Sequence, residues 1–252
     1  MIRNWMQPLA VMLLILLGYS TLAHGQEIDA NEMLKAIDKN LWAKTKRING
    51  RLIVDNGRRE RVMEVDTWME GTEKSYSFYK SPPREEGTQM LKLFDKLWMY
   101  TPRTDRKILI SGHLLRQSMM GSDLSYEDMM EDRELHKSYT AKVERREEIG
   151  GMKTLVLFLQ ANDPNLTYQT RRVWADPARQ LPLIEERYAK SGTLLKRVEF
   201  LDYRPISGRQ FPQSIVFRDM LKEDTKTTYA FDHIEFDVEV PEKYFSQSIL
   251  KR

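Results

Sequence analysis

The residues best suited to acid–base or metal chemistry are a cluster of acids in the middle of the sequence. The cluster contains Asp123, Glu127, Asp128, Glu131 and Asp132. General acid–base catalysis needs two carboxylates in different environments, so that their pKa values separate. On a short helix these acids would mostly be solvated, and acids at a helix start are favoured by the helix dipole. We therefore interpret the cluster as a solvated and capped helix start rather than a catalytic pair or a metal site.

The sequence contains no other catalytic signature. The histidines after residue 25 are His113, His136 and His233, which are widely separated and unaccompanied by other potential ligands. The sequence has no Gly-x-Ser-x-Gly, no phosphate-binding glycine-rich loop, no His-Glu-x-x-His and no EF-hand spacing. We interpret the histidines as loop or strand-surface residues. The sequence thus predicts no enzymatic activity, no metal and no cofactor.

The charge balance argues against a nucleic-acid partner. The chain has 40 Lys and Arg against 37 Asp and Glu. A nucleic-acid-binding protein has a marked basic excess on one face, whereas the arginine pairs here lie beside acids or within alternating segments. These pairs are Arg58-Arg59, Arg145-Arg146 and Arg171-Arg172. We interpret them as solvated strand faces, and a weak attraction to anionic lipid headgroups stays open.

The first 25 residues have the pattern of a cleaved secretory signal. Arg3 precedes the apolar run 9–17, and Ala23 and Gly25 supply small residues for a peptidase. The run is about half the roughly 20 apolar residues that a spanning helix needs. We expect residues 1–25 to be removed and residues 26–252 to form a single periplasmic domain. The chain has no cysteine, so we expect neither disulfides nor a lipid-bearing Cys, and hence not a lipoprotein.

Hydrophobic periodicity predicts one helix followed by many strands. Asp29 and Glu32 form a capping-box-like start, and Met33, Ile37 and Leu41 follow on one face, with Leu34 and Trp42 beside them. We expect this helix to bury one face against a sheet. Asn56-Gly57 predicts a two-residue hairpin turn in which both residues have positive φ. Segments with strand character are 48–55, 58–69, 74–79, 88–94, 97–100, 107–111, 139–148, 152–160, 168–175, 183–189, 193–203, 213–220 and 227–236. We expect ten or eleven strands in a mainly antiparallel sheet that is large enough to curl or close.

The segment 112–132 interrupts this strand pattern. It has no alternation and contains four methionines. Ser125 with Asp128, or Asp123 just before them, predicts the start of a short helix that runs to about Arg133.

Several strands are apolar on both faces, which has two explanations. Residues 155–159 and 97–100 lack polar alternates, so both faces are covered by core, or one face borders a dry cavity. Methionine side chains are flexible and suit variable apolar ligands, and 11 of the 14 methionines follow residue 25. Ordinary core packing explains the same residues, and the pattern alone leaves the choice open.

Several of these segments also resemble a known family. The segments 91–93 (LKL), 97–102 (LWMYTP), 107–112 (KILISG) and above all 117–128 (QSMMGSDLSYED) resemble the outer-membrane lipoprotein-sorting-like family of the LolA-like superfamily. The closing 240–245 (VPEKYF) is similar to the ending of that superfamily. The resemblance extends over essentially the whole chain after residue 25.

The resemblance implies an α+β, mainly antiparallel fold: an unclosed, highly curved β-barrel with helices covering its opening. It also implies an apolar cavity for the acyl chains of a lipid or lipoprotein in transit between membranes. An inner-membrane exporter and an outer-membrane acceptor are the implied partners. Gly112 and Gly121 would bound a mobile lid, and Arg116 is a candidate for headgroup contact. The candidate cavity or lid residues are Trp68, Met90, Trp98, Tyr100, Leu114, Leu115, Met119, Met120, Leu157 and Trp174.

Two other classes of function stay open. One is an envelope-lipid sensor or exporter-associated module of the same fold, which would keep its lipid when an acceptor is supplied. The other is a lipid hydrolase, which the lack of a nucleophile–base pair in the sequence disfavours.

Overall fold

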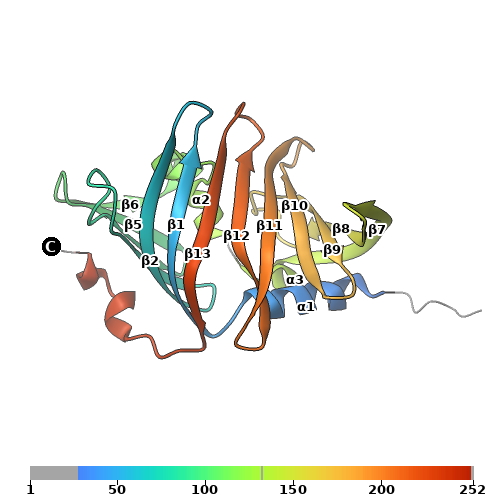
Figure 1. The fold of residues 1–252 in the computed structure, drawn as a ribbon. Coiled ribbons are helices and arrows are strands. Elements are labelled where there is room, and N and C mark those ends of the chain that lie inside the picture. Colours follow the sequence, from blue (N-terminus) through green and yellow to red (C-terminus); the bar gives the residue numbers. More distant parts are fainter. Residues whose placement is uncertain (1–27, 132, 251–252) are drawn as a thin grey trace, which may run out of the picture.

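The computed structural model describes residues 28–131 and 133–250, and the expected signal peptide lies outside them. All described strands form one antiparallel sheet in the order β6-β5-β4-β3-β2-β1-β13-β12-β11-β10-β9-β8-β7 (Figure 1). The strands are β1 Thr45–Asp55, β2 Glu60–Glu70, β3 Lys74–Tyr79, β4 Gln89–Leu93, β5 Lys96–Thr101, β6 Arg106–Ile110, β7 Tyr139–Ile149, β8 Met152–Ala161, β9 Thr170–Asp176, β10 Leu181–Tyr188, β11 Leu194–Ile206, β12 Arg209–Asp219 and β13 Lys226–Phe236.

The sheet consists of two meanders that meet at its centre. The first meander is β1 to β6, and the second is β7 to β13. β1 pairs with β13, and every other neighbour in the sheet is also a neighbour in the chain. β6 and β7 are therefore the two edges, and the sheet is open. The expected count of ten or eleven strands is wrong, because the sheet has 13. Each of the 13 segments with strand character in the sequence overlaps one of these strands, so the count was low although the segments were located correctly.

One hairpin of the sheet has a two-residue glycine turn, whereas the turn predicted at Asn56-Gly57 is longer than expected. Gly150 and Gly151 both have positive φ and join β7 to β8 in two residues, as the matching twist of such turns requires. The Asn56-Gly57 turn has four residues instead, because the last β1–β2 pair is Asp55 with Glu60. The Asn56 side-chain oxygen accepts hydrogen bonds from the backbone N–H groups of residues 58 and 59, which stabilises the longer loop.

The predicted helix is α1, Ala30–Leu41, and its cap and buried face are confirmed. The Asp29 carboxylate accepts hydrogen bonds from the backbone N–H groups of Asn31 and Glu32. Met33, Leu34 and Ile37 are buried in a core that the second meander supplies. The sheet residues of this core are Tyr139, Ala141, Leu155, Leu157, Leu159, Val173 and Ala175.

The two-sided apolar character of β4 and β5 has a packing explanation. Alternate residues of a strand point to opposite faces, and Met90 and Leu97 belong to a core on the inner face. Leu91 and Trp98 belong to a second cluster that includes Leu250. This outer cluster is covered by the C-terminal 3-10 helices η3, Glu242–Phe245, and η4, Gln247–Ile249. Both faces of these strands are thus covered by protein.

The chain between the edge strands β6 and β7 forms short helices instead of strands. They are η1 Gly112–Arg116, η2 Met119–Gly121, α2 Tyr126–Met130 and α3 Leu135–Ser138. α2 lies behind the central strands in Figure 1, and Met119 and Tyr126 pack with Leu52 and Val65 of those strands. The connection between the two edges therefore crosses the inner face of the sheet.

Within residues 28–131 and 133–250, none of the helices has the length and apolar character needed to cross a membrane.

Candidate ligand-binding cavity

A cavity of about 240 Å³ lies on the inner face of the sheet. Most of its apolar lining comes from alternate residues of five central strands, because a strand points every second side chain to the same face. These residues are Ile48 and Leu52 of β1, Val65 of β2, Val198 and Phe200 of β11, Phe211, Ile215 and Phe217 of β12, and Tyr229 and Phe231 of β13. The volume is a little below the roughly 300–1,000 Å³ of typical small-molecule sites.

The other walls of the cavity come from helical segments. Leu41 and Trp42 contribute from the end of α1, and Leu135 contributes from α3. Residues 117–131, which we call the strap, contribute the apolar side chains of Met119, Leu124 and Met129. Methionine adapts readily to differently shaped apolar surfaces.

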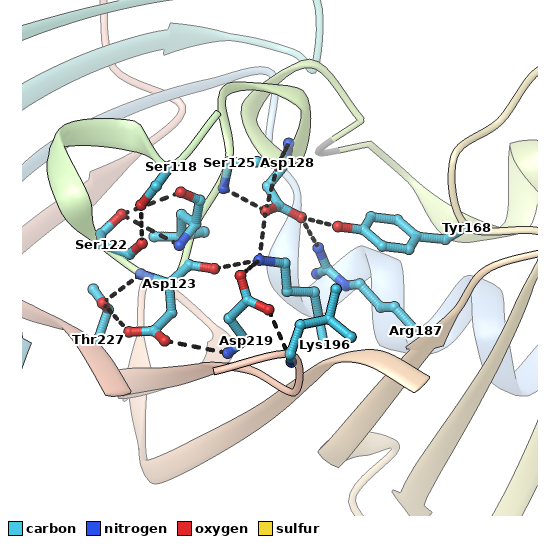
Figure 2. Close-up of polar contacts among 12 residues, drawn as sticks. Ser118, Ser122, Asp123, Ser125, Asp128, Tyr168, Arg187, Lys196, Asp219 and Thr227 are labelled. Atoms are coloured by element: carbon cyan, nitrogen blue, oxygen red, sulfur yellow. Dashed lines mark hydrogen bonds and ion pairs between the residues drawn. The ribbon is translucent and has the colours of Figure 1, made fainter. Parts of the chain in front are cut away.

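A buried aspartate, Asp123, attaches the middle of the strap to β12 and β13. Asp123 accepts a hydrogen bond from the Thr227 hydroxyl at 2.7 Å, and its backbone N–H donates to the same hydroxyl at 2.9 Å. The backbone N–H of Asp219 donates to the other carboxylate oxygen at 3.3 Å. Lys196 of β11 donates to the Asp123 carbonyl at 2.6 Å (Figure 2). These contacts are internal to the fold and leave Asp123 without access to solvent.

A second buried aspartate, Asp128, both caps α2 and anchors it. Its carboxylate accepts from the Ser125 backbone N–H at 2.7 Å, and its own N–H donates to the Ser125 hydroxyl at 3.1 Å. The Tyr168 hydroxyl donates to it at 2.6 Å and the Arg187 guanidinium at 3.2 Å (Figure 2). Burial alone would raise the pKa of Asp128, but the charges of Arg187 and Lys196 hold it below the ordinary value.

The first meander holds the strap from the other side. Lys92 of β4 donates hydrogen bonds to the carbonyls of Met129 at 2.9 Å and Met130 at 3.1 Å, at the end of α2. Arg61 of β2 donates to the Met120 carbonyl. A cation at a helix C-terminus also interacts favourably with the helix dipole. The strap is therefore attached to both meanders, across the inner face.

These contacts correct the sequence-based interpretation of the acidic cluster. The capping role of Ser125 and Asp128 is confirmed. The expectation of solvated acids is wrong for Asp123, Asp128 and Glu131, which are buried. It failed because the partners lie on distant strands: Thr227 for Asp123, Arg187 for Asp128 and Arg171 for Glu131.

Arg171 is a cationic partner that the sequence analysis interpreted as solvated. It is buried and lines the cavity. Its Nη1 pairs with Glu185 of β10, and its Nη2 lies 3.9 Å from Glu131 of the strap. Arg187 pairs with the same Glu185 at 3.1 Å. Burial would raise the pKa of Glu185, but the charges of Arg187 and Arg171 lower it below its ordinary value. One signal in the sequence was that Arg171 shares its strand face with the core residue Val173.

The expectation of an unaccompanied histidine is wrong for His136. Its Nδ1 and its backbone N–H both lie 2.8 Å from one oxygen of Asp38 in α1. Burial raises the pKa of the Asp38 carboxyl, and the hydrogen bonds from His136 lower it by a smaller amount. Asp38 also lines the cavity.

Of the ten residues expected to form a cavity or lid, six lie on the inner face of the sheet and four on its outer face. Met119 lines the cavity, and Met90, Leu114, Leu115 and Met120 pack in the core around it. Leu157 packs beneath α1. Trp68, Trp98 and Tyr100 belong to the outer cluster with the C-terminal helices. Trp174 lies on the outer face of β9, where its indole N–H donates to Glu147. The sequence missed the lining aromatics Phe211, Tyr229 and Phe231, whose alternation is equally typical of core.

Solved structures share the open antiparallel fold of this chain. The chain is similar to a DUF1329 family protein from Desulfovibrio piger, with 20% identity, a TM-score of 0.79, and coverage of 88% of this chain and 97% of that one. It is similar to an outer membrane lipoprotein-sorting protein domain from Vibrio parahaemolyticus, with 22% identity, a TM-score of 0.75, and coverage of 88% and 98%. A LolA superfamily protein from Nitrosomonas europaea matches with 22% identity, a TM-score of 0.74, and coverage of 88% and 99%.

At these identities the likeness concerns the fold alone. No curated protein matches the sequence of the chain. Residues 71–252 match the model of a family described as "-like: Uncharacterized protein", and the chain belongs to that family.

Proposed function

We propose that this protein is a periplasmic, non-enzymatic carrier that binds the acyl chains of a lipid or lipoprotein for transport between the inner and outer membranes. The observation that carries the proposal is the cavity on the inner face, whose wall of aliphatic and aromatic side chains comes from five central strands. A structural neighbour with the same fold is described as an outer membrane lipoprotein-sorting protein domain, which supports the same class of cargo.

Burial of methylene groups is the driving force in this proposal. Each methylene removed from water contributes about 0.8 kcal/mol, so affinity rises with the length of chain enclosed. A cavity of about 240 Å³ encloses part of a long acyl chain. The remainder is accommodated when Met119, Leu124 and Met129 of the strap change rotamer or the strap shifts outward.

The structure leads us to reassign the ligand contacts. We propose that Phe211, Ile215, Tyr229 and Phe231 contact the acyl chain, together with Met119 of the strap. Met90, Leu114, Leu115, Met120 and Leu157 support these walls from the surrounding cores. Trp68, Trp98, Tyr100 and Trp174 pack on the outer face, and we propose that they stabilise the fold.

Export and exchange complete the proposal. We propose that residues 1–25 direct the chain to the periplasm and that residues 26–252 act there as one domain. An inner-membrane exporter would load the cargo and an outer-membrane acceptor would receive it. Transfer from the loaded protein to acceptor vesicles distinguishes a carrier from a lipid sensor of the same fold, because a sensor retains its lipid.

Filling the cavity tests the proposal. Ile215 of β12 lines it, and Ile215→Trp replaces a small side chain with a large one there. Displacing two methylenes of ligand would weaken the binding of a fluorescent fatty-acid probe about tenfold. Leu201→Trp is the matched control, because Leu201 lies exposed on the neighbouring strand β11. Equal probe binding by both folded variants would contradict the proposed site.

A further inference from the structure

The cavity has a charged wall that an acyl chain alone does not require. Four acids line it, Asp38, Asp128, Glu131 and Glu185, together with five cations, Lys46, Lys92, Arg133, Arg171 and Arg187. Burying charge is costly unless every group is paired and hydrogen-bonded. The Asp128–Arg187 and Lys92 contacts are explained by attachment of the strap. The groups around Arg171 are not explained in this way.

The guanidinium of Arg171 lies 4.8 Å from the ring centroid of Tyr139 and has one donor, Nε, without a hydrogen bond. Its Nη1 is occupied by Glu185, whereas Nε is buried with no hydrogen-bond partner. Nη2 has the longer 3.9 Å ion pair with Glu131. The residue is 2% exposed, and a buried donor without a partner is costly. Nε and Nη2 form one edge of the planar fork, and two parallel donors of this kind match the two oxygens of a carboxylate or phosphate.

A second arginine adds to the same wall. The Nε of Arg133 is also buried without a hydrogen-bond partner, while its Nη2 donates to the Met130 carbonyl at 3.3 Å. Arg133 is two residues from Glu131, whose Oε2 contacts Arg171. Both arginines line the cavity, and the excess of cations over acids in its lining favours an anion there.

Two acceptor atoms limit where that anion can lie. Glu131 Oε2 and Asp38 Oδ1 are buried without hydrogen-bond partners, and as carboxylates they repel an oxyanion. Burial raises the pKa of Asp38 and so favours its neutral form, which weakens this repulsion. An oxyanion that enters must displace Glu131 from Nη2 of Arg171, a contact whose 3.9 Å length is beyond hydrogen-bond distance.

We propose that the charged wall is a binding site for the acid group of an anionic amphiphile, with its oxygens on Nε and Nη2 of Arg171 and on Nε of Arg133. The acyl chain then lies against the apolar wall of the central strands. This inference rests on the proposed function and narrows its ligand to lipids with a carboxylate or phosphate group that enters the cavity. The protein thereby discriminates among ligands with the same chain.

The test compares palmitate, palmitoyl lysophosphatidic acid and methyl palmitate as competitors of a fluorescent fatty-acid probe on the mature protein. We expect either acid to bind about tenfold or more tightly than the ester, since charge-assisted bidentate contacts are lost in the ester. The tighter of the two acids identifies carboxylate or phosphate as the preferred group. Arg171→Lys keeps the charge but removes the edge with two donors, and it should abolish the difference while ester binding is unchanged.

Two further variants make the outcome decisive. Arg133→Gln reports on the site if Arg171→Lys fails to fold, and it should reduce the preference for the acids. Arg172→Lys is the matched control, because Arg172 pairs with Glu144 instead of lining the cavity. Equal affinity of the wild-type protein for acid and ester would overturn the inference and leave the proposed function intact. Failure of all three amphiphiles to bind would contradict both.

Discussion

The carboxylate of Asp128, in the strap, lies 3.2 Å from the guanidinium of Arg187, in β10. Both side chains are largely buried, and both line the cavity. The pair joins the connection between the edge strands to the second meander, while Lys92 joins it to the first. This buried ion pair is thus one of the contacts that hold the strap over the proposed ligand site.

Removal of this carboxylate should destabilise the fold strongly. Breaking a buried pair by deleting one partner costs about 3–5 kcal/mol, because the remaining charge is left uncompensated. We expect Asp128→Ala to lower the free energy of unfolding by this amount in urea denaturation. The control is Asp232→Ala, which breaks the exposed Arg51–Asp232 pair and should cost less than about 1 kcal/mol. Similar losses for the two variants would show that Asp128 is not an anchor.

Stability should depend on pH through the same group. The pKa values of Asp128 and Glu185 are lower in the folded protein than in the unfolded chain, so the unfolded chain binds more protons in acid. Their stabilising contribution is complete above about pH 4, the ordinary carboxyl range, and is lost as the pH falls through the folded-state values. Asp38 has a raised pKa and acts in the opposite direction.

Urea unfolding between neutral pH and about pH 3 measures this dependence. Asp128→Asn should show a smaller loss of stability on acidification than the wild-type protein, because the titrating carboxyl is gone. Identical pH dependence in the two proteins would mean that Asp128 has an ordinary pKa in the folded state.

The capping box of α2 should control how easily the strap opens. Ser125→Ala removes the hydroxyl that accepts from the Asp128 N–H, and the loss of such a cap costs about 1 kcal/mol. We expect faster hydrogen exchange at the amides of residues 126–131, with little change at the amides of β1 and β13. An equal acceleration in the central strands would show that the strap opens only when the whole protein unfolds.

The outer cluster should matter for stability but leave ligand binding unchanged. Tyr244 of η3 stacks on Trp68 of β2 with ring centroids 4.2 Å apart. Tyr244→Ala should cost about 0.5–1.5 kcal/mol for the aromatic pair, in addition to the buried area. Affinity for a fluorescent fatty-acid probe should stay the same, since these rings lie opposite the cavity. Weaker probe binding by a folded Tyr244→Ala protein would support the original assignment of Trp68 to the ligand site.

Local features of the fold were predictable from the sequence. Asp29 and Ser125 cap helices through backbone groups two or three residues away, and the glycine pair at 150–151 forms a tight turn within a few residues. The alternation of apolar and polar residues along the sequence also located the strand segments correctly. Each of these features depends on near neighbours in the chain, which a pattern captures directly.

The charged wall could not be predicted in the same way. Asp128 contacts Tyr168 and Arg187, which are 40 and 59 residues away, and no local pattern reports such a pairing. Arg171 follows the alternation of an ordinary strand, so its burial depends on Glu185 and Glu131 from other segments. Similarly, the spacing of Phe211 and Phe231 is the same whether they face a core or a cavity.

Native mass spectrometry of the mature protein purified from a bacterial periplasm tests the central claim most directly. We predict a bound acylated molecule on the wild-type protein, identified after extraction, and its loss from Ile215→Trp but not from Leu201→Trp. A wild-type protein that carries no lipid and takes up no fluorescent fatty acid would contradict the claim and show that the inner face is ordinary core.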